Sequence, residues 1–329
     1  MRNEECLART LLILSNYDWI KAEAEAVGVE IIPIKGIDLL QSVYAERLDR
    51  FVRDIDLLCR SEEDCRRLVE RLCQEEYRLE FPFSMRPEVL KSKHKVSLLS
   101  CSTTKVNVDL HTAFVTKKFF SQTIGTFNAD AINRCRDGHM EATDRWLFLA
   151  QHVAFHMYGD FKWTIDLDLL YQQFTEGEKE ALSEKATRYG FRRVLAAALS
   201  HIAWHRGWMM HEGAPSADAI DSSPLQLTAS ERRFLRFIHH FDRPFSRKAA
   251  DRLIAAYWEF TFIDHRSERL KAWLHLMFPT KGALTNIYRI RHPLAFPLFY
   301  PLNILVSGIT SAVFWMTYTF ISRFDNKKS

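Results

Sequence analysis

The sequence lacks several features that would assign it quickly to a familiar class of protein. Its six cysteines show no Cys-x-x-Cys spacing, which argues against a zinc module and against a disulfide framework. A formal net charge of +4 is far from the basic excess that is typical of nucleic-acid-binding proteins. No internal repeat and no low-complexity tract is present. These absences leave an ordinary globular protein whose thiols stay reduced.

The N-terminus lacks the apolar core of a secretory signal, because Met1-Arg2-Asn3-Glu4-Glu5 is short of hydrophobic residues and acidic at its end. We therefore expect the main body of the chain to be cytoplasmic. With 329 residues, 47% of them hydrophobic, the chain can hold two domains or one domain with a large appendage.

What is present is a short strand-like stretch with two acids, residues 52–59. Its alternation places Asp54 and Asp56 on one side, while Ile55 and Leu57 point to the other. Two neighbouring carboxylates repel each other and are costly to desolvate unless a cation compensates them. Hard oxygen ligands of this kind suit Mg²⁺ or Mn²⁺.

A second stretch, residues 105–111, alternates in the same way and carries Asn107, Asp109 and His111 on its polar side. If the two strands are neighbours in one sheet, Asp109 becomes a third carboxylate beside the Asp-x-Asp pair. Three carboxylates can hold two metal ions, which clamp the attacking and leaving oxygens of a phosphoryl displacement. The competing interpretation is structural, since a lone Asp-x-Asp is common at solvated strand ends and in turns.

Basic residues precede the acidic strand. Residues 29–34 read as a buried strand, and Lys35-Gly36 stands where this strand meets a helix expected over 37–45. A glycine at that position lets the backbone approach a phosphate, and a helix N-terminus favours an anion. An ordinary strand-to-helix turn would look the same.

Three arginines, Arg47, Arg50 and Arg53, then lead into the acidic strand. They could neutralise a triphosphate or balance the nearby acids, and we favour Arg50 for phosphate.

The rest of the chain reads as mainly helical after a β-hairpin. Residues 4–27 are expected to form a helix, and Ser61 with Asp64 caps another. Residues 95–101 and 105–111 form the expected hairpin. Further helices are expected at 144–158, 162–171, 177–188, 190–209, 229–241, 246–261 and 264–278, with a linker at 211–228. His152 and His156 share one helix face, but Val153 follows His152 where a zinc peptidase has a glutamate. We interpret this pair as a packing feature.

The order strand, Lys-Gly, helix, Arg-x-x-x-Asp-x-Asp, helix, hairpin, Val-Asp-Leu-His resembles the bacterial uncharacterised nucleotidyltransferase family, which belongs to the polymerase-β-like superfamily. The resemblance covers roughly residues 28–210. The matching residues are Lys35, Gly36, Tyr44, Arg50, Asp54 to Leu58, His94, Asp109 to His111, His152, Trp163, Asp166 and Gly190.

This resemblance implies Mg²⁺- or Mn²⁺-dependent transfer of a nucleoside monophosphate from an NTP, such as ATP, to an acceptor, with release of pyrophosphate. Carried over residue by residue, Asp54 and Asp56 bind metal and triphosphate. Asp109 is the third metal-binding carboxylate and a candidate base. The Lys35-Gly36 turn replaces the Gly-Ser pair usual in the superfamily, a departure shared by related toxin-type enzymes. Further candidates around this site are His94, His111, His152, Lys162 and Asp166.

The expected fold class is α+β, with a small mixed β-sheet, flanking helices and a mainly helical second half. We expect a nucleotidyltransferase-like core at 1–125, a helical domain at 126–280 and a basic and apolar C-terminal segment at 281–329.

The C-terminal segment contains no charged residue from position 293 to 322. Prolines interrupt its first third, which leaves 302–321 as a helix of bilayer length flanked by basic residues. One side of this helix is polar and the other apolar. The segment therefore spans a membrane, lies on one, or docks on the protein, and spanning is the less favoured form of membrane contact.

Three functions remain open. The leading one is nucleotidyl transfer to an unidentified hydroxyl acceptor in envelope-polysaccharide or natural-product biosynthesis. The alternatives are toxin-like nucleotidylation of RNA and a catalytically silent, membrane-associated nucleotide-binding scaffold. Basic and aromatic residues are little interleaved, which argues mildly against nucleic acid as a partner.

Overall fold

The computed structural model describes residues 2–46, 50–82, 84–102, 106–114, 122–156, 160–210, 228, 262–280, 284 and 296–324. The chain divides into two compact units. Unit 1 comprises residues 1–117, 128–141 and 280–293, and unit 2 comprises residues 118–127, 142–279 and 294–329.

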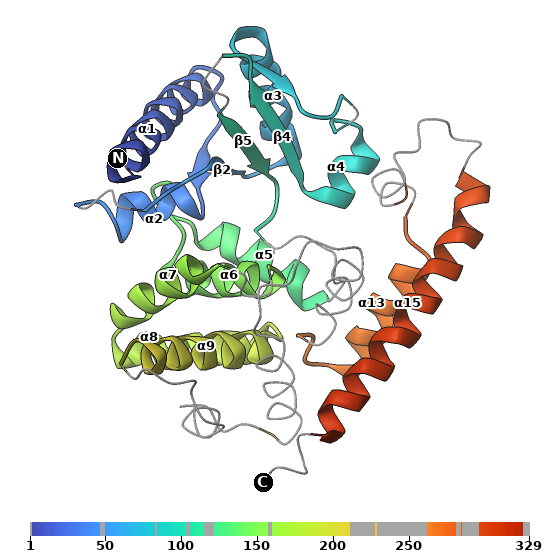
Figure 1. Ribbon diagram of the computed structural model, residues 1–329. Coiled ribbons are helices and arrows are strands. Elements are labelled where there is room, and N and C mark those ends of the chain that lie inside the picture. Colours follow the sequence, from blue (N-terminus) through green and yellow to red (C-terminus); the bar gives the residue numbers. More distant parts are fainter. Residues whose placement is uncertain are drawn as a thin grey trace. The chain divides into compact units, whose positions relative to one another are not determined.

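Unit 1 is built on a five-stranded mixed sheet (Figure 1). Its strands are β1 (Ile31–Pro33), β2 (Asp54–Cys59), β3 (Tyr77–Leu79), β4 (Lys95–Ser100) and β5 (Asn107–His111). They lie in the order β1-β2-β5-β4-β3. The β2–β5 pair is parallel and the other three pairs are antiparallel. The two acidic stretches of the sequence are therefore the two central neighbours.

Helices connect most of the successive strands of this sheet (Figure 1). They are α1 (Arg2–Ala26), α2 (Gly36–Ser42), α3 (Glu62–Glu75) and α4 (Pro87–Lys93), followed by α5 (Gln122–Arg134), whose second half belongs to unit 1. Ser61 caps α3 by accepting a hydrogen bond from the Asp64 amide, as the sequence predicts. The α+β class is confirmed.

The two faces of the sheet differ in polarity because each strand alternates. Ile55, Leu57, Val108 and Leu110 are fully buried on one face. α1 covers this face, since Tyr77 of β3 stacks on Trp19 and its hydroxyl donates to Asn16, 3.1 Å away. The other face carries the polar residues of β2, β5 and β4. One face of the sheet is therefore buried and apolar, and the other is polar.

Some elements of unit 1 differ from the sequence-based expectation. The strand expected at 29–34 is shorter. It lies at the edge of the sheet with Pro33 as its last residue, as the proline indicates, because a missing N–H costs little there. The short elements β3 and α4 and the longer helix α5 were not predicted. All six cysteines are free, as expected, although Cys73 and Cys101 are exposed.

Unit 2 is helical (Figure 1). α6 (Ala142–Phe155), α7 (Phe161–Gln172), α8 (Glu176–Arg188) and α9 (Arg192–Met210) pack together, and α13 (Arg266–Met277) packs on α15 (Phe296–Phe324). The Trp146 indole is fully buried and donates to the Leu167 carbonyl at 3.0 Å. The helices expected at 229–241 and 246–261 lie outside the described residues, as does the linker at 211–228 apart from Thr228.

The C-terminal helix begins earlier than the sequence predicts. α15 starts at Phe296 and contains Pro301, whereas the prolines were expected to delay the helix to residue 302. That expectation was wrong because the first helical turn needs no N–H donors, so Pro297 is tolerated there and Pro301 removes a single bond. No helix among the described residues is long and apolar enough to cross a membrane.

Candidate functional site

The parallel pairing of β2 and β5 brings the predicted carboxylates together. Asp56 stands opposite Asp109, and Asp54 stands opposite Asn107. Directly paired residues of neighbouring strands point to the same face. The structure therefore gathers Asp54, Asp56 and Asp109 on the polar face of the sheet, as the sequence predicts for neighbouring strands.

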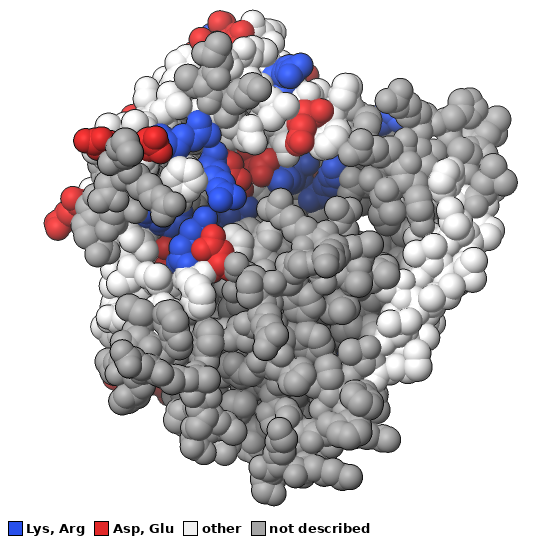
Figure 2. All heavy atoms as spheres, in the orientation of Figure 1, with Lys and Arg blue, Asp and Glu red and all other residues white. Residues whose placement is uncertain are grey.

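Two lysines hold this acidic group. Lys35 follows β1, and its Nζ atom lies 2.6 Å from Oδ1 of Asp56. Lys95 begins β4, and its Nζ atom lies 2.7 Å from Oδ2 of Asp109. The Ser97 hydroxyl donates to the other Asp109 oxygen at 2.6 Å. In the space-filling view, basic side chains gather around acidic ones on one face of the molecule (Figure 2).

The surroundings of the two β2 carboxylates shift their pKa values in opposite directions. Burial alone would raise the pKa of Asp56, but Lys35 and the hydrogen bond to His111 outweigh burial and hold that pKa well below its usual range. Burial, together with the charges of Asp56 and Asp109, raises the pKa of Asp54 to about 6. Asp56 is thus a stable anion, while Asp54 carries charge that lacks full compensation.

His111 completes the cluster from β5. Its Nε2 atom lies 3.0 Å from Oδ1 of Asp56, and burial together with Lys35 lowers the pKa of the imidazole. One ligand atom each from Asp56, Asp109 and His111 lie within 4.8 Å of one another. Two carboxylates beside a neutral imidazole make a donor set that fits a divalent cation such as Mg²⁺ or Mn²⁺. Asp54, two residues from Asp56 along β2, can add a further oxygen.

The Lys35-Gly36 turn is tightly built. Lys35 has a positive φ of 54°, an unusual value for a residue with a side chain. A Cβ on Gly36 would lie 2.8 Å from Cγ1 of Val52 and 3.3 Å from a guanidinium nitrogen of Arg50. Only glycine fits there, because Val52 and the buried Arg50 pack directly on its backbone. The predicted phosphate-binding residues Lys35, Gly36 and Arg50 therefore form one local structure.

Two other predicted residues of unit 1 have different surroundings. Arg53 is exposed, and its guanidinium lies 5.9 Å from the centre of the Phe51 ring. His94 is buried at the end of α4 in a left-handed conformation, where its carbonyl accepts from the Thr112 amide at 2.9 Å.

The three candidates from the helical half all lie in unit 2. His152 forms ring contacts with His156 and Trp163, with centroids 4.5 and 5.7 Å away. Lys162 pairs with Asp160 at 3.2 Å. Asp166 is buried in α7. His152 and Lys162 are half-buried, and the interpretation of the two histidines as a packing feature agrees with their aromatic contacts.

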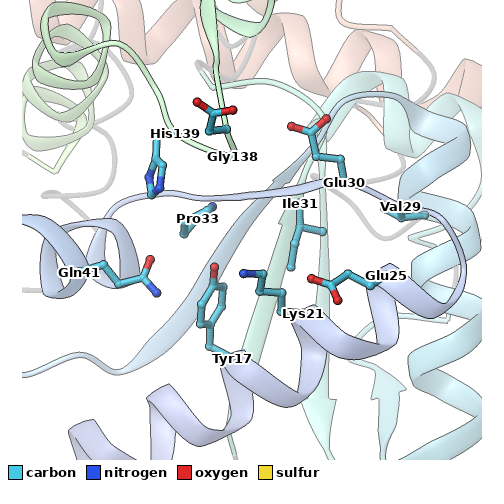
Figure 3. A pocket seen from close by; sticks show the side chains of 11 residues that line it. Tyr17, Lys21, Glu25, Val29, Glu30, Ile31, Pro33, Gln41, Gly138 and His139 are labelled. Atoms are coloured by element: carbon cyan, nitrogen blue, oxygen red, sulfur yellow. The ribbon is translucent and has the colours of Figure 1, made fainter.

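A cavity of about 530 Å³ lies elsewhere in unit 1 (Figure 3). Tyr17 and Lys21 reach into it from α1, Gln41 from α2, and His139 from the turn after α5. It runs along β1, where Ile31 pairs with Cys59 on the face opposite to the carboxylates. The cavity is thus separate from the acidic cluster, and we assign it no part in phosphate chemistry.

Sequence reasoning missed Lys95 and Ser97. Both alternate with the buried Val96 and Leu98 in β4, so their strand face was readable. A hairpin centred on residue 103 also fixes the pairing of Ser97 with Asp109, which the structure has. The alternation of this strand and the position of the hairpin turn together indicate that Lys95 and Ser97 lie beside Asp109.

Comparison with known families agrees with this geometry. A model of an uncharacterised nucleotidyltransferase family matches residues 2–207, well over half of the chain. A search of the curated proteins finds no match. The chain therefore belongs to the uncharacterised nucleotidyltransferase family and is an enzyme that transfers a nucleotide from an NTP.

Proposed function

We propose that this nucleotidyltransferase transfers a nucleoside monophosphate to a hydroxyl acceptor at the polar face of the sheet, with Asp54, Asp56 and Asp109 as its metal-binding carboxylates. One observation carries the proposal. The register of β2 and β5 sets Asp56 beside Asp109, and each carboxylate is already paired with a lysine. Such a concentration of charge is costly in a fold and is typical of functional sites.

The proposed reaction is an in-line displacement at the α-phosphorus of the NTP. A bond forms between the acceptor oxygen and the α-phosphorus, the bond from that phosphorus to the bridging oxygen breaks, and pyrophosphate leaves. The hydroxyl proton passes to a carboxylate of the cluster, for which Asp109 is the candidate. Bound Mg²⁺ or Mn²⁺ would neutralise phosphate charge at this site.

The basic residues have a proposed role in holding the triphosphate. Lys35 is already at the cluster, and Arg50 packs on Gly36 beside it. A planar guanidinium and a mobile ammonium suit phosphate oxygens in different ways, the first as a two-pronged donor and the second as a point charge. Arg53, exposed beside Phe51, is proposed for a peripheral part of the nucleotide.

The partners of this reaction are an NTP, which cells keep in the cytoplasm, and an acceptor that carries a hydroxyl group. We place the reaction in the cytoplasm for that reason, with the acceptor in envelope-polysaccharide or natural-product biosynthesis. RNA as the acceptor is the alternative. Membrane contact through residues 293–322 is a separate proposal, because residues 294–322 belong to unit 2 and the carboxylate cluster belongs to unit 1.

The test is incubation of the purified protein with Mg²⁺ and each α-labelled NTP, together with protein, RNA or a lipid extract as acceptor. Label transfer should occur with one acceptor class and be lost in an Asp54→Asn/Asp56→Asn double variant. Asp18→Asn, which changes an exposed acid of α1, is the matched control and should transfer label normally. Transfer that survives the double variant would remove the carboxylates from the mechanism.

A further inference from the structure

The C-terminal helix α15 in unit 2 buries polar side chains and exposes apolar ones, the reverse of the usual arrangement in water. On α15, Asn303, Ser307, Thr310 and Ser311 are buried, with Asn303 only 4% exposed. The opposite side of the same helix exposes large apolar side chains: Leu302, Leu305, Val306, Ile309, Val313, Trp315 and Met316. Leu305, Ile309 and Met316 are each about 60% exposed, at 61%, 59% and 64%. We call this surface the α15 apolar face.

The buried polar side of α15 is occupied by α13. The Asn303 amide donates to the Leu276 carbonyl at 2.8 Å, and the Trp273 indole donates to the Ser311 hydroxyl at 2.9 Å. Gly308 lets the Met277 side chain approach to within 3.8 Å of the position a Cβ would take. Small residues and hydrogen-bonding side chains between two helices, with apolar side chains outside, follow the packing rule of helices in lipid.

The charges agree with a lipid surface rather than with full insertion. No helix among the described residues can cross a membrane. The exposed residues of α13 include the basic Arg266 and Lys271 beside the apolar Leu270 and Leu274. α15 itself has no charged residue before Arg323, and Arg289 and Arg291 precede the charge-free stretch in the sequence. Basic residues that flank an apolar helix favour an anionic membrane surface.

We propose that α15 lies in the plane of an anionic membrane surface, with its apolar face in the acyl region. A helix of 29 residues is about 43 Å long, which gives a lengthwise contact along the bilayer. Trp315 lies on the exposed face, as is common for residues at the headgroup level. The contact does not depend on nucleotidyl transfer, since all of its residues belong to unit 2.

The experiment is flotation of the full chain with phosphatidylcholine vesicles that contain about one-third phosphatidylglycerol. The wild-type chain should float with these vesicles, and less with phosphatidylcholine alone. A Leu305→Glu/Ile309→Glu variant should bind the vesicles about tenfold or more weakly, because two charges replace apolar side chains that the membrane would bury. Leu11→Glu, on an exposed apolar residue of α1 in unit 1, is the matched control and should float like the wild type.

Circular dichroism and sedimentation velocity accompany the flotation, so that misfolding and self-association are seen. Both glutamate variants should keep the helix content of the wild type. If the wild-type chain does not float, or if the double variant floats equally well, the proposal is wrong. A wild-type dimer that does not float and that the double variant converts to a monomer would assign the α15 apolar face to a second copy of the chain.

Discussion

Lys35 and Asp56 stand 21 residues apart in the sequence, yet the Lys35 Nζ atom lies 2.6 Å from Oδ1 of Asp56. Lys95 and Asp109 form the same relationship 14 residues apart. In both pairs an ammonium occupies a position from which a divalent cation would also contact the carboxylate. A metal ion bound by these carboxylates would have to compete with the two lysines, and it would free them to contact phosphate.

Lys35→Met should weaken binding of Mg·NTP by about tenfold or more, because a charge-assisted hydrogen bond to phosphate is lost. Titration calorimetry with an NTP analogue that has a non-cleavable α,β bridge measures this directly. Lys35→Arg keeps the charge and should stay within a few-fold of the wild type. Unchanged affinity in Lys35→Met, with only a lower melting temperature, would restrict Lys35 to neutralising Asp56.

Lys95→Gln should strengthen the binding of Mn²⁺ alone by several-fold, because it removes a cation that competes for Asp109. The same variant should melt at a lower temperature in EDTA, since Asp109 then keeps only the Ser97 hydroxyl. Paramagnetic resonance of free Mn²⁺ gives the affinity. Lys91→Gln, an exposed lysine of α4, is the control. Weaker Mn²⁺ binding in Lys95→Gln would instead make Lys95 a residue that positions Asp109 for the metal.

Asp54→Asn should stabilise the metal-free protein at pH 7.5. Since the pKa of Asp54 is raised from 3.8 to about 6 in the folded state, its favourable contribution is complete below pH 4 and is lost as the pH rises through about 6. Removing the charge should therefore gain on the order of 2 kcal/mol at pH 7.5 and nothing near pH 4. Thermal melts in EDTA at both pH values test this. A variant less stable than the wild type at pH 7.5 would contradict it.

Gly36→Ala should destabilise unit 1 by about 1–3 kcal/mol, because the new methyl group collides with Val52 and Arg50. Val52→Ala in the same chain removes the closest colliding atoms and should restore part of the loss. Urea unfolding of both single variants and the double variant measures the coupling. Purely additive effects would show that the contact does not make Gly36 necessary.

The sequence predicted the common face of the three aspartates better than it predicted the elements around them. The alternation of residues 52–59 and 105–111 was enough to identify the three aspartates and their common face. The pairing of these two strands could not be predicted in the same way, because the parallel pairing of β2 with β5 depends on the intervening α3, β3, α4 and β4. Two of these elements, β3 and α4, have only 3 and 7 residues, too few for a clear period.

The C-terminal helix shows a second limit of sequence reasoning. Its polar and apolar sides could be read from the sequence, but periodicity alone does not say which side is buried. The usual assumption is that the apolar side is buried. The structure has the reverse, since Asn303 and Ser311 bond to α13 while Ile309 faces outward. The determining interactions are hydrogen bonds to α13 residues about 27 to 38 positions away, and no local pattern encodes them.

Binding of Mg·NTP by the carboxylate cluster can be tested without knowledge of the acceptor. The most direct measurement is titration calorimetry of the four non-cleavable NTP analogues, with Mg²⁺ or with EDTA, into the wild type, Asp56→Asn and the control Asp18→Asn. We expect at least one analogue to bind the wild type and Asp18→Asn only with Mg²⁺, and Asp56→Asn to lose that binding. Equal binding to Asp56→Asn, or no Mg²⁺-dependent binding of any analogue to the wild type, would contradict the account.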